Sequence, residues 1–174
     1  MKTQIVKESL ILPTWEEILS TAPKEILDLI EQSKTTPQGT NWHPEGEVYK
    51  HIRIVFDRAR KSGDINLLIC GLFHDLGKIS TTAPNKKGGW SAIGHERVSA
   101  KLAGKYHDWI TEQGGNPEEV RELVFQHMRI KQFDQMKGSK KAIMRADPLF
   151  GKLNQFTSCD DMQTLTDEEL NRYK

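Results

Sequence analysis

The stretch that decides the fold reads Leu67-Leu68-Ile69-Cys70-Gly71-Leu72-Phe73-His74-Asp75-Leu76-Gly77-Lys78. It begins as an uncharged apolar run and ends in an adjacent histidine and aspartate, followed by Gly77 and Lys78. Such an apolar run belongs in a protein core, where a charged group is costly unless it is paired or bound to a metal ion. We therefore expect His74 and Asp75 to be either a hydrogen-bonded polar cap on a buried helix or two ligands of one ion.

The composition is that of an ordinary globular domain. The 174 residues are 36% hydrophobic and 28% charged, with a formal net charge of +1, which gives no reason to expect attraction to nucleic acid or membranes. Cys70 and Cys159 stand in apolar surroundings and are interpreted as buried free thiols, which favours a cytoplasmic location. Met1–Ser9 is too polar for a signal peptide, and no window approaches a membrane span. We expect no membrane partner and no stable nucleic-acid binding, and leave homo-oligomerisation open.

Helical periodicity on both sides of the opening stretch predicts an all-α domain of about seven or eight helices. Apolar residues recur at the spacing of one buried face over residues 47–61. A long helix is expected over residues 92–113, with His95 and Val98 on its buried face. Gly77 suits a C-terminal cap of the helix before it. No segment shows convincing strand alternation, so no sheet is expected.

Capping signals divide the rest of the chain. Residues that suit helix N-caps are Thr14, Asp64, Asn116, Asp147 and Thr166. We expect a single domain with three parts: residues 1–40 as an N-terminal helical extension, residues 42–162 as the core that carries the chemistry, and residues 163–174 as a C-terminal helix.

Several polar residues fall on the inner faces or ends of different predicted helices. They are His51, His74, Asp75, His95, His127 and Asp160. A lone histidine on an apolar face is usually a hydrogen-bonded core residue, but several of them together with two carboxylates satisfy one another best around a metal ion. The donors are nitrogen and oxygen, without a thiolate cluster, which is typical of a catalytic site with open positions.

Three motifs resemble the HD-domain metal-dependent phosphohydrolases, an all-α superfamily. They are Trp42-His43-Pro44-Glu45-Gly46-Glu47-Val48-Tyr49-Lys50-His51, Phe73-His74-Asp75-Leu76-Gly77-Lys78 and Gly94-His95-Glu96. The resemblance covers residues 42–162, roughly two-thirds of the chain. It is strongest to the HD domain of bacterial tRNA nucleotidyltransferases, and it suggests a stand-alone bacterial or phage protein.

The resemblance implies one or two divalent ions, with Mn, Co, Ni, Zn, Fe and Mg all left open. The first ion would be held by His51, His74, Asp75 and Asp160. A second would be held by His95 and His127, with Asp75 bridging. The last ligand of the first ion is the weakest assignment, because Asp161 is adjacent to Asp160. Helical phase favours Asp160, whereas Asp147 is better explained as a helix cap.

The resemblance also implies roles for residues near these ligands. Asp75 and Lys78 are expected to be catalytic, and Lys78 either holds a phosphate oxygen or simply complements the negative end of a helix. His43 is either a substrate contact and general acid or a loop histidine that bonds to the backbone. Glu47 either positions a metal ion or is a favourable first-turn acid.

Further candidates for substrate binding are two tryptophans and one arginine. Trp42 and Trp90 either stack on a base or act as a lid or core aromatics. Arg97 either contacts substrate or is plain surface charge, since it lies two residues from His95 and two positions on a helix do not share a face.

By resemblance, the expected function is hydrolysis of a phosphate ester of a small nucleotide or nucleotide-like substrate by metal-activated water. Nucleotidase, 2′,3′-cyclic phosphodiesterase and dNTP triphosphohydrolase activities all remain open. The alternatives are an HD-type di-iron oxygenase and a non-catalytic nucleotide-binding module.

Overall fold

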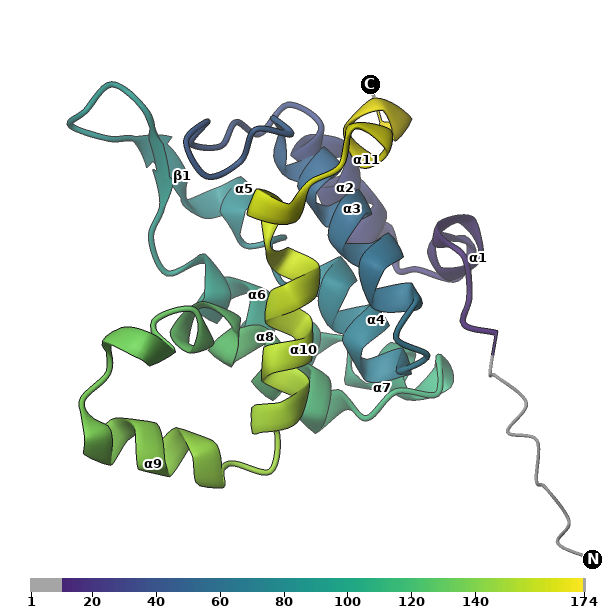
Figure 1. Ribbon diagram of the computed structural model, residues 1–174. Coiled ribbons are helices and arrows are strands. Elements are labelled where there is room, and N and C mark those ends of the chain that lie inside the picture. The colour runs from purple at the N-terminus through teal and green to yellow at the C-terminus, as the bar shows by residue number, and fades with distance from the viewer. Residues whose placement is uncertain (1–10, 174) are drawn as a thin grey trace, which may run out of the picture.

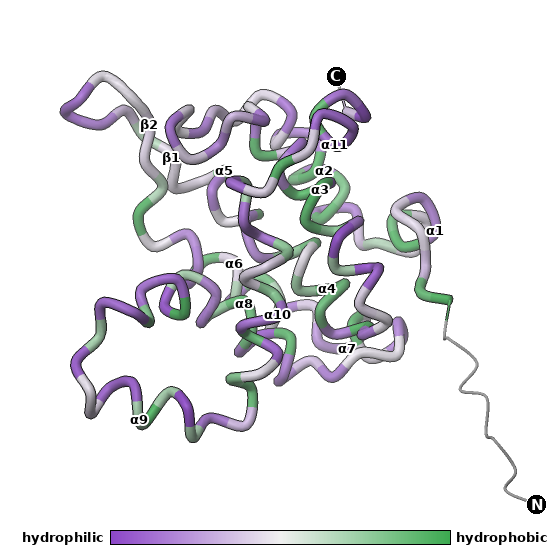
Figure 2. The backbone as a smooth tube through the Cα atoms, in the orientation of Figure 1, coloured by the Kyte–Doolittle hydropathy of each residue, from purple (hydrophilic) through white to green (hydrophobic). Residues whose placement is uncertain are grey.

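Helix α4 (Ile65–Phe73) lies at the centre of the fold and carries the apolar run. The structure, a computed structural model, describes residues 11–173, and every residue of α4 from Asn66 to Phe73 is buried. The Asp64 side chain caps the helix by accepting hydrogen bonds from the backbone N–H groups of its first turn. Helices α3 (Val48–Arg60) and α8 (Pro117–Ile130) pack against it, and Figure 2 shows hydrophobic segments meeting there. The predicted buried helix is confirmed.

The all-α fold class is confirmed, although the helices are shorter and more numerous than expected. Residues 11–173 form eleven α-helices, two 3₁₀ turns and a single hairpin (Figure 1). The remaining elements are α1 (Trp15–Ser20), α2 (Lys24–Ser33), α5 (Lys78–Thr81), β1 (Thr82–Pro84), β2 (Trp90–Ala92), α6 (His95–Lys105), α7 (His107–Glu112), η1 (Phe133–Gln135), α9 (Gly138–Ala146), α10 (Phe150–Asp160), η2 (Met162–Thr164) and α11 (Asp167–Arg172). Within the described residues, no helix is both long enough and apolar enough to cross a bilayer.

The long helix expected over residues 92–113 is divided at Tyr106 into α6 and α7. Its buried face also differs from the prediction, because Val98 is 40% exposed while Ser99 and Ala103 are fully buried. The prediction that Val98 belongs to the core was wrong. Small side chains at positions 99 and 103 allow α6 to approach its neighbours closely, and apolar periodicity cannot detect this kind of contact.

Gly77 is required for this close approach, not for a helix cap. Its φ of −63° is ordinary for any residue, so the predicted role as a C-terminal cap was wrong. Its backbone N–H donates to Ser99 Oγ at 2.8 Å. A Cβ atom at position 77 would overlap the carbonyl oxygen of His95 and lie 2.9 Å from the backbone nitrogen of Ser99. The absent side chain therefore sets the distance between the end of α4 and the start of α6.

We expect Gly77→Ala to lower the free energy of unfolding by about 3 kcal/mol, because backbone must move to admit the methyl group. Gly138→Ala is the matched control, since its added Cβ would meet nothing within 4 Å. Urea denaturation of both variants measures the difference. Equal stability of the two variants would contradict this account of Gly77.

A short hairpin follows α5, although no sheet was expected. Strands β1 and β2 pair antiparallel, with Thr82 opposite Ala92 and Pro84 opposite Trp90. Each strand has only three residues, too few for alternation to be visible in the sequence. The hairpin projects from one edge of the helical body in Figure 1 and carries Trp90.

The C-terminal segment is fastened to α3 by Arg58. The guanidinium donates to both carboxylate oxygens of Glu169, each at 2.7 Å, and its hydrogen bonds lower the pKa of Glu169 to about 2. It also donates to the carbonyl oxygens of Cys159 and Asp161, at 3.3 and 2.8 Å. This arrangement, which we call the Arg58 clamp, holds the end of α10 and helix α11 together.

Several smaller expectations were right, and one stays open. Cys70 and Cys159 are free and buried. The capping box at Thr14 and the Asn116 cap form as predicted. The division into residues 1–40, 42–162 and 163–174 stays a prediction. The expectation for Met1–Ser9 lies outside the described residues.

Candidate metal centre

The structure brings the six predicted polar residues to one place at the ends of five elements. His51 belongs to the first turn of α3, His74 and Asp75 directly follow α4, His95 begins α6, His127 lies in the last turn of α8 and Asp160 ends α10. Each is at most 5% exposed. Helix ends bring these side chains together because α3, α4, α6, α8 and α10 pack on one another.

One cluster of donor atoms forms around His51. Its Nε2 atom lies 3.1 Å from Nε2 of His74 and 3.0 Å from Oδ1 of Asp160. The same atom is 3.2 Å from Oδ2 of Asp75. The donor atoms of His51, His74 and Asp160 lie within 4.8 Å of one another, so they can share one ion.

A second cluster lies on the other side of Asp75. The Nε2 atoms of His95 and His127 are 3.3 Å apart. The Oδ1 atom of Asp75 lies 3.1 Å from the first and 3.7 Å from the second. Asp75 thus presents one oxygen to each cluster, which is the arrangement of a carboxylate that bridges two ions.

The protonation of the imidazoles fits a bound cation. In three of the histidines, Nδ1 faces a backbone carbonyl oxygen, which can only accept a hydrogen bond, so Nδ1 carries the proton and Nε2 presents a lone pair in the neutral ring. These lone pairs point at each other and at carboxylate oxygens, since Asp75 Oδ1 lies 3.1 Å from His95 Nε2. The Nδ1–carbonyl pairs are His74 with Gly71 at 3.0 Å, His95 with Ala92 at 2.7 Å and His127 with Val124 at 2.6 Å. The nitrogen and oxygen donors therefore fit a divalent metal ion.

The surroundings of the two aspartates favour their charged, carboxylate form. Burial alone would raise the pKa values of Asp75 and Asp160, but the neighbouring lysines, Lys78 and Lys131 respectively, act together with the surrounding histidines and lower both pKa values well below the usual range. Burial alone would lower the pKa of His51, but hydrogen bonds to the surrounding carboxylates outweigh it and raise the pKa to about 10. Burial lowers the pKa of His74 to about 4.

Glu45 is a candidate positioning residue, to which the sequence analysis assigned no role of its own. Its side chain is buried, and Oε1 accepts from Nδ1 of His51 at 2.7 Å and from Nδ1 of His43 at 2.9 Å. Burial alone would raise the pKa of Glu45, but these hydrogen bonds outweigh it and lower the pKa to about 2. Glu45 therefore orients His51 as the backbone carbonyls orient the other three histidines. The sequence signal that could have indicated this role is the position of Glu45 in a loop between His43 and His51.

We expect Glu45→Gln to weaken divalent-metal binding by about 10- to 100-fold. Glutamine has nearly the shape of glutamate but no negative charge, so it holds the His51 ring less firmly in the orientation that binds the ion. The matched control is Glu47→Gln, since Glu47 precedes α3 and its half-exposed carboxylate pairs with Lys50 at 3.1 Å. Competition with a fluorescent chelator measures both affinities. An equal loss in the two variants would contradict a special role for Glu45.

Lys78 is buried, and its ammonium is surrounded by acceptors. Nζ lies 2.7 Å from Asp75 Oδ2, 2.7 Å from Gln38 Oε1 and 3.4 Å from His43 Nε2. The His43 ring is therefore fixed between Lys78 and Glu45, at the edge of the clusters. These contacts make Lys78 a residue that positions Asp75.

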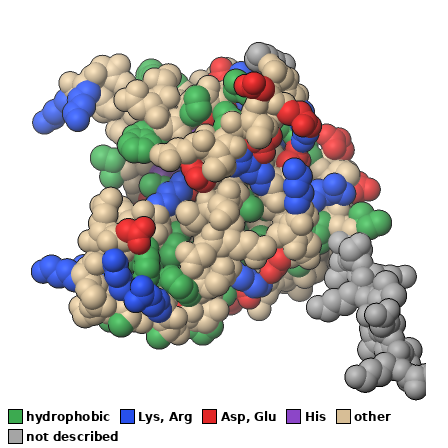
Figure 3. All heavy atoms as spheres, in the orientation of Figure 1, with side chains coloured by type: hydrophobic (Ala, Val, Ile, Leu, Met, Phe, Trp, Pro, Cys, Tyr) green, Lys and Arg blue, Asp and Glu red, His purple; other side chains and the backbone are tan. Residues whose placement is uncertain are grey.

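Asp75, His95 and Asp160 line a cleft of about 920 Å³. Trp42 and Trp90 line it from the loop before α3 and from the hairpin, and they are 73% and 42% exposed. Figure 3 shows the hollow on this face, with hydrophobic side chains at its border and histidine within. Arg97 lies apart from the cleft, with its side chain 79% exposed and 3.8 Å from Glu96.

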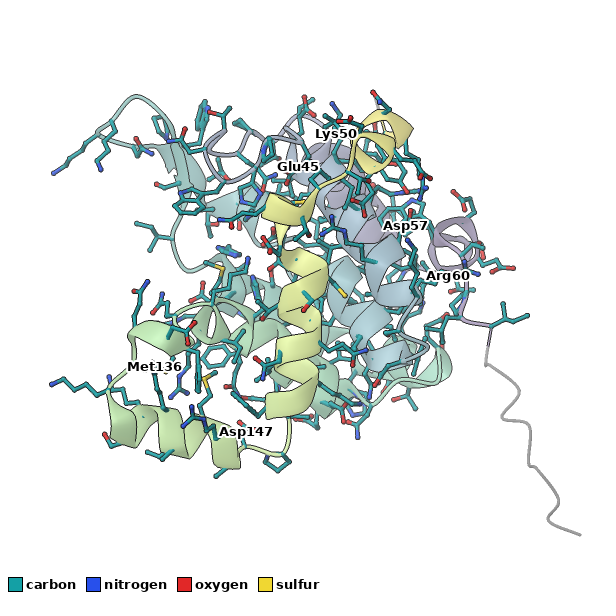
Figure 4. The ribbon with its side chains drawn as sticks, in the orientation of Figure 1. Glu45, Lys50, Asp57, Arg60, Met136 and Asp147 are labelled. Atoms are coloured by element: carbon teal, nitrogen blue, oxygen red, sulfur yellow. The ribbon has the colours of Figure 1, made fainter. Side chains whose placement is uncertain are left out.

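The structure distinguishes the three aspartates that were considered as the last ligand of the first ion. Asp160 is 3% exposed and faces His51. Asp161 turns away and accepts a hydrogen bond from the backbone N–H of Gln163, which caps η2. Asp147 lies near the opposite end of α10, far from Glu45 in Figure 4, and accepts a hydrogen bond from the backbone N–H of Leu149.

Clusters of buried histidines and aspartates beside a cleft in a helical bundle are compatible with a metal-dependent enzyme. Residues 48–149 match the HD domain family. The chain belongs to the HD-domain family, a superfamily of metal-dependent phosphohydrolases. Comparison with curated proteins finds no match, and comparison with solved structures finds none either. The narrower resemblance to tRNA nucleotidyltransferases stays an expectation.

Proposed function

We propose that this protein hydrolyses a phosphate ester of a nucleotide or nucleotide-like small molecule, with the two histidine–aspartate clusters as the binding site of one or two divalent ions. The observation that carries the proposal is the single carboxylate of Asp75, which faces both clusters and lines an open cleft. A divalent ion in such a site supplies Lewis-acid polarisation of phosphate oxygens and activation of the attacking water.

The chain's own residues perform the positioning. Backbone carbonyls hold His74, His95 and His127 with Nε2 directed into the clusters, and Glu45 does the same for His51. Lys78 holds Asp75 through Oδ2, whereas His95 and His127 face Oδ1 of the same carboxylate. Groups held in this way need little rearrangement when charge develops on a phosphate in the transition state.

The cleft supports a nucleotide as the substrate. Its volume of about 920 Å³ lies within the range of roughly 300–1,000 Å³ that is usual for small-molecule sites. Trp42 and Trp90 offer partly exposed aromatic faces on which a base can stack. A cleft lined by both tryptophans and metal-binding donors matches a molecule with an aromatic end and a phosphate end.

The test is a panel of nucleoside monophosphates, 2′,3′-cyclic nucleotides and dNTPs, each assayed with several divalent metals for released phosphate, released pyrophosphate or opened cyclic ester. We expect metal-dependent hydrolysis of at least one class, abolished by a chelator. The same assay under nitrogen separates the alternatives: hydrolysis that persists with manganese or cobalt and without oxygen excludes a di-iron oxygenase. Nucleotide binding without turnover under every metal would contradict the proposal and favour the non-catalytic module.

A further inference from the structure

Lys131 is a second lysine beside the buried aspartates: Lys78 contacts Asp75, and Lys131 contacts Asp160. It follows the last residue of α8, one helical turn beyond His127. Its Nζ atom lies 2.6 Å from Oδ2 of Asp160, and its side chain is 33% exposed. Lys131 also lines the cleft that leads to the metal-binding residues. Lys131 therefore lies next to a predicted metal ligand and can also be reached by a molecule in the cleft.

The surroundings of Lys131 differ from those of Lys78. Lys78 has Gln38 and His43 beside its ammonium in addition to Asp75, and only 9% of its side chain is exposed. Lys131 has Asp160 as its one ion-pair partner within residues 11–173. The two oxygens of Asp160 face different partners, since Oδ1 lies 3.0 Å from His51 Nε2 and Oδ2 lies 2.6 Å from Lys131 Nζ. An ammonium carries three donors, so Lys131 has donors to spare beside the cleft once Oδ2 of Asp160 has accepted one of them.

We propose that Lys131 binds a terminal phosphate group of the substrate and makes the site selective for phosphomonoesters over phosphodiesters. This inference rests on the proposed function and adds the substrate class. A phosphomonoester near neutral pH carries up to two negative charges and three non-bridging oxygens, one more charge and one more oxygen than a diester. An ammonium in addition to the metal-binding residues gives the third oxygen a partner, and charge-assisted hydrogen bonds of this kind are the stronger ones.

A simpler role for Lys131 would be to neutralise buried Asp160. That role predicts a different result, because removing a cation that competes with the metal would tighten metal binding and leave recognition of the phosphate unchanged. Binding of inorganic phosphate and metal content therefore distinguish the two roles independently of turnover.

The experiment compares Lys131→Met, Lys131→Arg and the control Arg129→Met, an exposed cation two residues earlier that does not line the cleft. The substrates are p-nitrophenyl phosphate and bis(p-nitrophenyl) phosphate in the presence of manganese. For Lys131→Met we expect kcat/KM on the monoester to fall by about 10- to 100-fold, and on the diester by less than about 3-fold. Lys131→Arg should recover part of the loss, and Arg129→Met should match the wild type.

Calorimetric titration of the manganese-loaded proteins with inorganic phosphate provides the readout without turnover. We expect Lys131→Met to weaken phosphate binding by about 10-fold or more at unchanged metal content. Equal losses on the two esters, or unchanged phosphate affinity, would overturn the role of Lys131. If the wild type hydrolysed neither ester or any nucleotide, the proposed function would fail, and the phosphate titration would still decide whether Lys131 binds phosphate.

Discussion

Replacing Asp75 by asparagine is expected to reduce metal-dependent hydrolysis by about 1,000-fold or more. The substitution preserves shape but exchanges a charged oxygen donor for an amide at the residue that faces both clusters. Loss of several kcal/mol of charge stabilisation by metal ions corresponds to a rate change of this order. Steady-state kinetics with a phosphomonoester and saturating manganese measure the change in kcat.

The control for this variant is Asp161→Asn, which changes the same functional group at the edge of the cleft. Asp161 caps η2 and faces neither cluster, so its replacement should leave kcat within about 3-fold of the wild type. Circular dichroism spectra of both variants should match the wild type. Full activity of a correctly folded Asp75→Asn protein would refute the proposed function.

The second large effect concerns stability. Adding a divalent ion to the metal-free protein is expected to stabilise it by about 3–4 kcal/mol when the ion is at 100 to 1,000 times its Kd. For a chain of this size the gain corresponds to a rise in Tm of roughly 10 °C. The physical reason is that lone pairs and carboxylates, which face one another at 3.0–3.3 Å, acquire a common positive partner. Thermal unfolding with added manganese and with a chelator measures the difference.

Asp160→Asn and Asp161→Asn provide the matched pair for this experiment. Asp160 is buried beside His51, whereas Asp161 is half-buried and caps η2. The metal-induced rise in Tm should shrink by more than half in the first variant and persist in the second. A rise of the same size in both would show that the ion binds elsewhere.

The sequence predicted those parts of the fold and site that repeat with helical spacing. The run Leu67–Phe73 could be assigned to a buried helix because it contains no charged residue. The period of an α-helix placed His127 and Asp160 on inner faces, and the structure brings both to the same centre. The assignment of these residues as metal ligands stays a prediction.

Other features depend on contacts between distant segments and carry no local period. Glu45 lies in a loop, so only its distance to His51 reveals its role. Gly77 appeared to be a helix cap because the sequence does not show the carbonyl of His95 beside it. In the sequence, Lys131 looks like an ordinary surface lysine after the end of a helix. Only the fold shows that its ammonium lies beside Asp160.

The Arg58 clamp contacts both the end of α10, where Asp160 lies, and helix α11. Its guanidinium holds the carbonyl oxygens on both sides of Asp160 and the carboxylate of Glu169 in α11. We therefore expect the docking of α11 and the position of the Asp160 carboxylate to be coupled, and such coupling acts equally in both directions. An ion held by Asp160 would then stabilise the docked position of α11, and a substitution that releases α11 would weaken the binding of that ion.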